Sequence, residues 1–172
     1  MQNTQYRTLD ATGLREYLVS HSGMSRRLGG PADTWSVQEV SDGNLNMVWL
    51  VHGPDGALCA KQSLPHVRVD PSWKMPTERT FFEAAWLREI SQIAGNGIPE
   101  LLHFDPDLFL LVMQCLDHHT TLNIALSDMT YDPSEAVSAI ARFVARTAWS
   151  TSCLSETFEE NYGVSSVKED DD

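Results

Sequence analysis

Short apolar runs separated by turn sequences predict an antiparallel sheet in the first third of the chain. Strand-like segments cover residues 35–40, 45–52 and 57–64. They are joined by Ser41-Asp42-Gly43-Asn44 and by Gly53-Pro54-Asp55-Gly56, which contain the residue types that tight turns require. Three short strands joined by two tight turns predict a β-meander.

A short helix is predicted before this meander. Asp10 is a suitable N-cap, and Gly23 is a plausible stop. Residues 24–33 contain adjacent glycines and a proline, so they are expected to form a loop. The apolar residues that share one face of this helix are Leu14, Tyr17 and Leu18.

After the meander, the pattern predicts a loop over residues 65–75, a helix, and two further strands. Pro76 suits the first turn of the helix, and glycines at 95 and 97 mark its end. The strands are expected at 101–104 and 108–114. The apolar residues at helical spacing between 76 and 95 are Phe82, Trp86, Leu87 and Ile90.

Helices are predicted after residue 120. Residues 121–126 predict a short helix, and Asp132 followed by Pro133 and Glu135 is typical of a helix start. Strands followed by helices in this order predict an α+β fold. The apolar face of the last helix contains Val137, Ile140, Ala141, Val144 and Ala148. Four of the five tryptophans, Trp35, Trp49, Trp86 and Trp149, are expected to be core or helix-contact residues.

Charge restricts the partners. The 172 residues hold 24 acidic and 12 basic side chains, for a net charge of −12. Such a balance argues against binding to nucleic acid or to an anionic membrane surface. Residues 156–172 contain seven acidic residues and one lysine, so the tail 155–172 is expected to be acidic and disordered.

Neither a membrane helix nor a signal peptide is predicted, because no apolar run approaches about 20 residues and the N-terminus lacks a basic-then-apolar start. The cysteines, Cys59, Cys115 and Cys153, are widely spaced and form no metal-like or redox-like pair. A reduced cytoplasmic compartment is therefore expected.

A glycine turn, a strand lysine and a helix glutamate follow one another in an order that indicates phosphate chemistry. Backbone amides near Gly43 can approach a phosphate, and Lys61 on the third strand can reach the same group. The next helix offers Glu83, or alternatively Glu78, to hold that lysine. A lysine–glutamate pair of this kind organises phosphoryl transfer in protein-kinase-type enzymes.

Residues 114–117 could serve as a hinge between a β-rich lobe and a helical lobe, or simply as a strand-to-helix loop. The adjacent sequence Asp117-His118-His119 resembles a metal-binding cluster. Neighbouring histidines point to different sides of a strand or helix, so a surface loop is the preferred interpretation.

Three segments resemble S-methyl-5-thioribose kinases. Residues 40–48 (VSDGNLNMV) are similar to a "GDGNLN" loop, and residues 60–68 (AKQSLPHVR) to a "KQALPYVR" segment. Residues 72–84 (SWKMPTERTFFEA) are similar to "SWPLTxERAYFEA". The resemblance extends over roughly residues 8–154 and implies a protein-kinase-like fold.

The resemblance implies an ATP- and Mg²⁺-dependent kinase that phosphorylates the 1-hydroxyl of 5-methylthioribose in methionine salvage, with a possible homodimer as in the family. It implies that Trp73 lies near the sugar. The implied nucleotide-binding residues are Gly43, Asn44, Asn46, Lys61, Glu83, Gln114 and Leu116. Gln114 departs from the family's usual glutamate.

The family's catalytic His-Gly-Asp and metal-binding Asp-x-Glu sequences have no counterpart in this sequence. We therefore expect no catalytic aspartate and no Mg²⁺ ligand in this chain. The expected organisation is an N-terminal lobe over residues 1–113, a hinge over 114–117 and the start of a truncated helical C-terminal lobe over 118–154. A non-catalytic nucleotide-binding or regulatory fragment that pairs with a full-length subunit is the alternative.

Overall fold

The computed structural model describes residues 6–41, 43–128 and 132–150, and the chain divides into two compact units. Unit one comprises Met1–Glu89 and Ile98–His118, and unit two comprises Ile90–Gly97 and His119–Asp172. The tail expected over residues 155–172 lies outside the described residues, as does Cys153.

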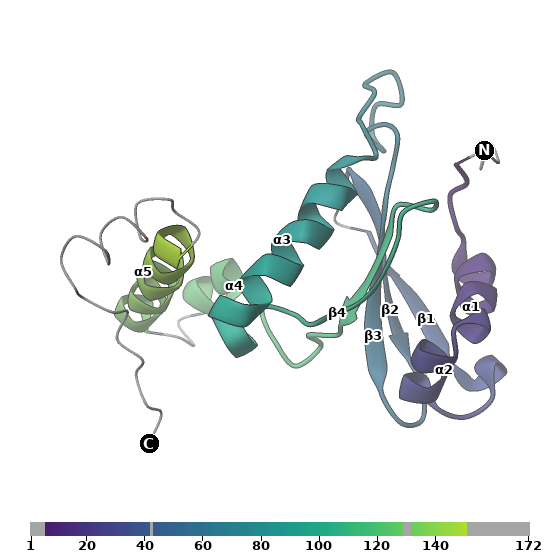
Figure 1. Cartoon of the computed structure of the whole chain (residues 1–172), viewed down its shortest axis with the longest axis horizontal. Helices are drawn as coiled ribbons and strands as arrows, with labels where there is room; N and C mark the ends of the chain where they lie inside the picture. Colours follow the sequence, from purple (N-terminus) through teal and green to yellow (C-terminus); the bar gives the residue numbers. More distant parts are fainter. Residues whose placement is uncertain (1–5, 42, 129–131, 151–172) are drawn as a thin grey trace. The chain divides into compact units, whose positions relative to one another are not determined.

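Unit one is built on a five-stranded, wholly antiparallel sheet in the order β1-β2-β3-β5-β4 (Figure 1). This confirms the predicted α+β fold with an antiparallel sheet. The strands are β1 (Ser36–Val40), β2 (Asn46–His52), β3 (Ala57–Ser63), β4 (Leu101–Asp105) and β5 (Leu110–Gln114). The last strand begins two residues later than predicted, because Phe109 adopts a positive φ of 49° just before it.

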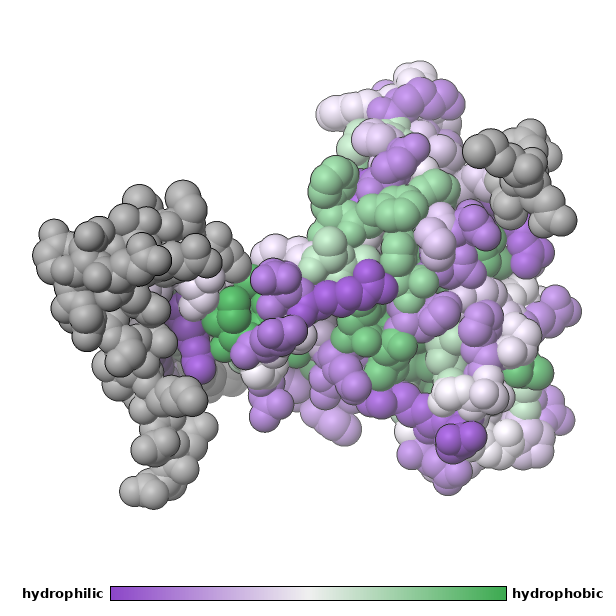
Figure 2. Space-filling model, viewed as in Figure 1, coloured by the Kyte–Doolittle hydropathy of each residue, from purple (hydrophilic) through white to green (hydrophobic). Residues whose placement is uncertain are grey.

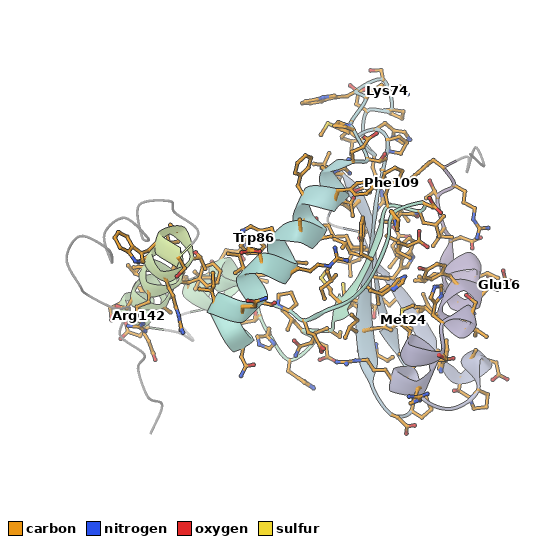
Figure 3. The ribbon with its side chains drawn as sticks, in the orientation of Figure 1. Glu16, Met24, Lys74, Trp86, Phe109 and Arg142 are labelled. Atoms are coloured by element: carbon orange, nitrogen blue, oxygen red, sulfur yellow. The ribbon has the colours of Figure 1, made fainter. Side chains whose placement is uncertain are left out.

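Helices cover both faces of this sheet (Figure 1). On one face, α1 (Ala11–Ser20) and α2 (Ser22–Leu28) enclose the main hydrophobic core, and Figure 3 shows Met24 between α2 and the sheet. On the other face lies α3 (Arg79–Ala94). The sheet residues of the main core are Trp49, Val51, Leu58, Ala60, Leu110 and Val112.

Gln62 is a buried polar residue that joins the N-terminal segment to the sheet. Its side-chain amide donates to the carbonyls of Arg7, at 2.9 Å, and Leu108, at 3.0 Å. Its Oε1 accepts a hydrogen bond from the backbone N–H of Leu9 at 2.8 Å. Without Gln62 these backbone groups would be buried away from water with no hydrogen-bond partner. The fully buried amide therefore stabilises the segment that leads into α1.

Two predictions for the N-terminal helices are wrong. The first helix ends at Ser20 rather than Gly23, because His21 is extended with φ −110° and ψ 98°. The first part of the predicted loop 24–33 belongs instead to α2, which ends at Leu28 and is followed by Gly29 with a φ of +68°. Met24 and Leu28 are buried at i, i+4 spacing, which is the helical signal that the glycine-rich neighbourhood concealed.

The helix α3 also differs from its prediction. It begins at Arg79 rather than Pro76, and Phe82 and Trp86 are 77% and 46% exposed. Figure 2 shows hydrophobic residues on the surface where α3 lies. The residues that α3 buries within unit one are Thr80, Ala84 and Leu87. Small side chains at 80 and 84 allow a close approach to the sheet. Of the aromatic residues of α3, Phe81 packs edge-on against Phe104 of β4.

The tryptophans divide accordingly. Trp35 and Trp49 are buried in the main core, as predicted. Trp86 and Trp149 are exposed, so they do not lie in the core, and the alternative that they contact a helix remains. Periodicity alone could not separate the two pairs, because each pair lies within an apolar pattern.

Unit two contains the last turn of α3, α4 (Leu122–Ser127) and α5 (Pro133–Ser150). The predicted start of α5 is confirmed, since Asp132 Oδ1 accepts a hydrogen bond from the Ser134 N–H at 2.8 Å. The predicted apolar face of α5 is largely exposed in the structure: its exposed members are Val137, Ile140 and Val144. None of the described helices is long and apolar enough to cross a membrane.

The N-cap of α1 makes a prediction about stability. Asp10 Oδ1 accepts a hydrogen bond from the Gly13 N–H at 2.7 Å. We expect Asp10→Ala to lower the free energy of unfolding by about 1 kcal/mol, and Asp10→Asn to have a smaller effect because its amide oxygen still accepts. Urea unfolding followed by circular dichroism measures both, and equal effects of the two variants would contradict the capping role.

Acid is expected to destabilise unit one through His103. Burial and the neighbouring His21, whose ring centre lies 4.9 Å away, lower the pKa of His103. Because the folded pKa lies below the unfolded value of about 6.5, the unfolded state binds more protons as the pH falls. Stability should therefore decline as the pH falls below about 7, and His103→Phe should flatten that decline. An unchanged slope in urea titrations across this range would refute the assignment.

Candidate functional site

A bidentate ion pair joins the central strand to α3. Lys61 Nζ lies 2.6 Å from Glu83 Oε1 and 2.8 Å from Glu83 Oε2. The two residues are 22 positions apart in sequence. Of the two glutamates considered from the sequence, Glu83 is the one that contacts Lys61, and Glu78 is exposed.

Strand register and helix packing together position this pair. Lys61 lies opposite Val48 on β2 and Leu111 on β5. Glu83 is flanked by the small buried residues Thr80 and Ala84, which bring the start of α3 close to this face of the sheet. The Thr80 hydroxyl also contacts the hydroxyl of Ser63, two residues beyond Lys61 on β3.

The ion pair is partly open to solvent, with side-chain exposures of 26% for Lys61 and 35% for Glu83. Pairs in such surroundings contribute little to stability, on the order of 0–1 kcal/mol. Its more important effect is to hold a lysine ammonium at a fixed place on the sheet face. A fixed, accessible ammonium is suited to binding an anionic group.

The loop 43–46 is anchored mainly through Arg79, which sequence reasoning did not identify. Arg79 donates hydrogen bonds to the carbonyls of Leu45 and Leu64 and to Asn46 Oδ1, the last at 3.2 Å. Burial lowers the pKa of Arg79. The available signal was its position in the segment 72–84, beside the predicted helix start.

Backbone hydrogen bonds complete the anchoring of this loop. The Arg68 N–H donates to the carbonyl of Asn44 at 2.8 Å, and the Leu64 N–H to that of Leu45 at 3.0 Å. Asn46 begins β2 opposite Ser63, and its side chain is occupied by contacts within the protein. The loop is therefore tied to the same end of β3 that presents Lys61.

Gly43 has no steric requirement for glycine within the described chain. A Cβ there would meet only the Asn46 carbonyl oxygen, at 3.8 Å, and its φ is not positive. Apart from its chain neighbours, no other described atom lies within 4 Å of such a Cβ. Its open backbone fits the close approach of an external group such as a phosphate.

The face between Lys61 and the end of the sheet carries less polar side chains. Cys59 lies two residues before Lys61 on β3, opposite Met113 on β5. Burial, the largest effect, raises the pKa of the Cys59 thiol to about 11. A neutral thiol beside a methionine makes this part of the face suited to an apolar or aromatic group.

The remaining predicted site residues lie apart from the ion pair. Gln114 ends β5, and its Oε1 accepts from the Glu100 N–H at 3.3 Å. Leu116 follows it and is exposed. Trp73 is 64% exposed in the loop before α3, whose outer part Figure 3 marks at Lys74. The backbone of Trp73 pairs with Val67 and Asp70 of its own loop, so the structure does not bring it to Lys61.

The described residues include one group of histidine, cysteine and carboxylate side chains close enough to share a cation. It consists of His52, Cys115 and Asp117. This group differs from the consecutive residues Asp117-His118-His119 considered from the sequence. The His118 side chain is 95% exposed, and its Nε2 lies 3.6 Å from Asp117 Oδ1. His52 was not considered from the sequence, since 65 residues separate it from Asp117.

The antiparallel sheet, α3 and the lysine–glutamate pair together define the N-terminal lobe of a protein-kinase-like fold. Comparison with known proteins supports a closer relationship. The chain is 35% identical over 166 residues to methylthioribose kinase 2 of Oryza sativa subsp. japonica, covering 95% of this chain and 39% of that protein. It is 34% identical over 157 residues to methylthioribose kinase of Escherichia coli O45:K1, covering 90% and 37%.

These relatives confirm the resemblance to methylthioribose kinases that the sequence segments predicted. The chain spans about two fifths of the length of the curated relatives it matches. No protein-family model matches the chain.

The anchoring of loop 43–46 is open to a direct test. We expect Arg79→Lys to increase amide hydrogen exchange in this loop at least about tenfold, because lysine cannot reproduce the several hydrogen bonds of the guanidinium. Arg26→Lys, at an exposed site, is the matched control and should leave exchange unchanged. Equal exchange in both variants would show that Arg79 does not anchor the loop.

Proposed function

We propose that this chain forms the ATP-binding lobe of a methylthioribose kinase. The observation that carries the proposal is the bidentate Lys61–Glu83 pair on a sheet face next to the anchored loop 43–46. The similarity to methylthioribose kinases over about nine tenths of the chain supports it.

Each part of this lobe has a chemical task in the proposal. Lys61 binds the ATP phosphates, Glu83 holds the lysine in place, and the loop from Gly43 through Asn44 to Asn46 covers the phosphates with its backbone. Mg²⁺ would neutralise charge on those phosphates when bound. The proposed fit of the phosphates to this site rests on the accessible ammonium of Lys61 and on the absence of close side-chain contacts at Gly43.

The adenine is assigned to the other end of the same face. Cys59 and Met113 provide a weakly polar surface there, and the backbone at Gln114 and Leu116 can pair with the adenine edge. In this interpretation residues 114–117 form the hinge, with a lobe over 1–113 before it and the start of a helical lobe over 118–154 after it. The chain passes from unit one into unit two after His118, although unit two also includes Ile90–Gly97 from within the proposed lobe.

The reaction proposed for the complete kinase is ATP-dependent phosphorylation of the 1-hydroxyl of 5-methylthioribose in methionine salvage, in the cytoplasm. This lobe would contribute the position of the transferred phosphoryl group and the charge that stabilises it. Trp73 is assigned to the sugar side. Because the sequence contains no His-Gly-Asp, we propose that the catalytic base is not supplied by these 172 residues.

A second candidate is a non-catalytic fragment that pairs with a full-length kinase subunit, or with a second copy as a homodimer. The exposed face of α5 favours it, since Val137, Ile140 and Val144 are each at least half exposed. Exposed apolar faces of this kind commonly mark contact surfaces. Under this alternative the chain would bind nucleotide without transferring phosphate.

Nucleotide binding tests the proposal. We expect calorimetry to detect Mg·ATP binding to the chain, and Lys61→Ala to weaken it at least about tenfold, since a charge-assisted contact to phosphate is lost. Glu83→Gln should weaken binding less, because Lys61 remains but is no longer held. Lys74→Ala, at an exposed lysine, is the matched control.

These outcomes test the role of Lys61 and the absence of a catalytic base, because both candidates predict nucleotide binding without phosphate transfer. Equal affinities of the Lys61 and Lys74 variants would refute the assigned role of Lys61. Mg·ATP binding without ATP consumption in the presence of 5-methylthioribose is the result expected of this lobe. Turnover by the chain would show that a catalytic base lies within it, and would exclude the non-catalytic alternative.

A further inference from the structure

Three side chains with different donor atoms converge at the end of the sheet. His52 is the last residue of β2, whereas Cys115 and Asp117 follow β5. Their ligand atoms all lie within 4.8 Å of one another. His52 Nε2 and Asp117 Oδ2 are already 3.1 Å apart.

Strand register explains why residues so distant in sequence meet here. His52 lies opposite Ala57, the first residue of β3, and Leu58 lies opposite Gln114, the last residue of β5. The ends of β2 and β5 therefore flank the start of the same central strand. The convergence is a property of the sheet and does not depend on unit two.

The donor set has a clear chemical preference. An imidazole nitrogen, a thiolate sulfur and a carboxylate oxygen suit borderline-soft cations, Zn²⁺ above all, whereas Mg²⁺ prefers oxygen ligands alone. Around tetrahedral Zn²⁺, bond lengths of about 2.0–2.3 Å place neighbouring ligand atoms about 3.3–3.7 Å apart. The pair formed by His52 and Asp117 is close to that spacing, so a modest side-chain movement of Cys115 completes the set.

We propose that His52, Cys115 and Asp117 form a binding site for one Zn²⁺ ion. Three protein ligands leave a fourth position for water or another small ligand. The site borders a cavity of about 470 Å³ whose wall includes the turn Gly53–Gly56. Both His52 and Asp117 are partly exposed, with side-chain exposures of 39% and 30%, so an ion can enter from solvent.

Binding is a ligand exchange with a defined proton balance. The Cys115 thiol loses its proton to solvent as the Zn–S bond forms, and Zn²⁺ gives up water molecules to the three side chains. No oxidant or reductant is involved. The bound ion would link residues 115–117 directly to the end of β2.

This link has a consequence that rests on the proposed function. His52 extends from the same sheet face as Cys59 and Lys61, at its far end, and Cys115 directly follows β5. If residues 114–117 form the nucleotide hinge, bound Zn²⁺ would fix the hinge backbone and change ATP affinity. The cation site itself stands independently of that function.

Cobalt absorption provides the test, because a thiolate bound to Co²⁺ gives a charge-transfer band that carboxylate or imidazole ligands do not give. The experiment uses the untagged 172-residue chain carrying Cys153→Ser, which leaves Cys59 and Cys115 as its thiols. We expect one equivalent of Co²⁺ to produce this band and Zn²⁺ to remove it. Co²⁺ held by the acidic residues near the C-terminus gives no such band.

Matched variants identify the ligands. Cys115→Ser should abolish the band, whereas Cys59→Ser should retain it. His52→Ala should raise the Kd for Co²⁺ at least tenfold, whereas His118→Ala, at the exposed neighbouring histidine, should leave it unchanged. Circular dichroism establishes that each variant is folded.

The proposal is overturned if the parent chain shows no thiolate band at millimolar Co²⁺, or if folded Cys115→Ser keeps it. Equal effects of His52→Ala and His118→Ala would also overturn the ligand assignment. A Zn²⁺ site that leaves Mg·ATP affinity unchanged would reject only its coupling to the hinge. Loss of ATP binding in Lys61→Ala is measured without Zn²⁺, so the two proposals fail separately.

Discussion

The alternation of side chains along β3 is the constraint on which both layers of unit one depend. This strand pairs with β2 on one side and with β5 on the other, so its register sets the position of both neighbours. Leu58, Ala60 and Gln62 face α1 and α2, whereas Cys59 and Lys61 face the side of α3. A shift by one residue would exchange these two sets between core and functional face.

Adjacent residues on β3 therefore perform opposite tasks. Gln62 is fully buried and satisfies three backbone groups of segments that lie far from it in sequence. Lys61 is held at the surface by one carboxylate. The buried amide fixes the strand against the N-terminal segment, and this gives the neighbouring lysine a rigid base. A site on a well-supported strand can hold its geometry without contributing much to stability.

The packing of α3 also contributes to the position of Lys61. Phe81 packs edge-on against Phe104 of β4, at 5.2 Å between ring centres, while Glu83 reaches Lys61 bidentately. Thr80 and Ala84 lie on the sheet side, and Phe82 and Trp86 remain exposed. The helix thus gives up part of its apolar burial, and the exposed aromatics leave a surface suited to further packing.

Local signals in the sequence determined most of the secondary structure. Turn residues and alternating patterns located the strands, and Asp10 and Asp132 marked helix starts, because capping and turn geometry depend on neighbouring residues. The sequence also placed a glycine loop, Lys61 and a helix glutamate in order. Only the tertiary structure decided that Glu83 rather than Glu78 pairs with Lys61, that Phe82 and Trp86 of α3 are exposed, and that His52 meets Cys115 and Asp117. These outcomes depend on strand register and on the spacing between layers, which join residues far apart in the chain and leave no periodic signal in it.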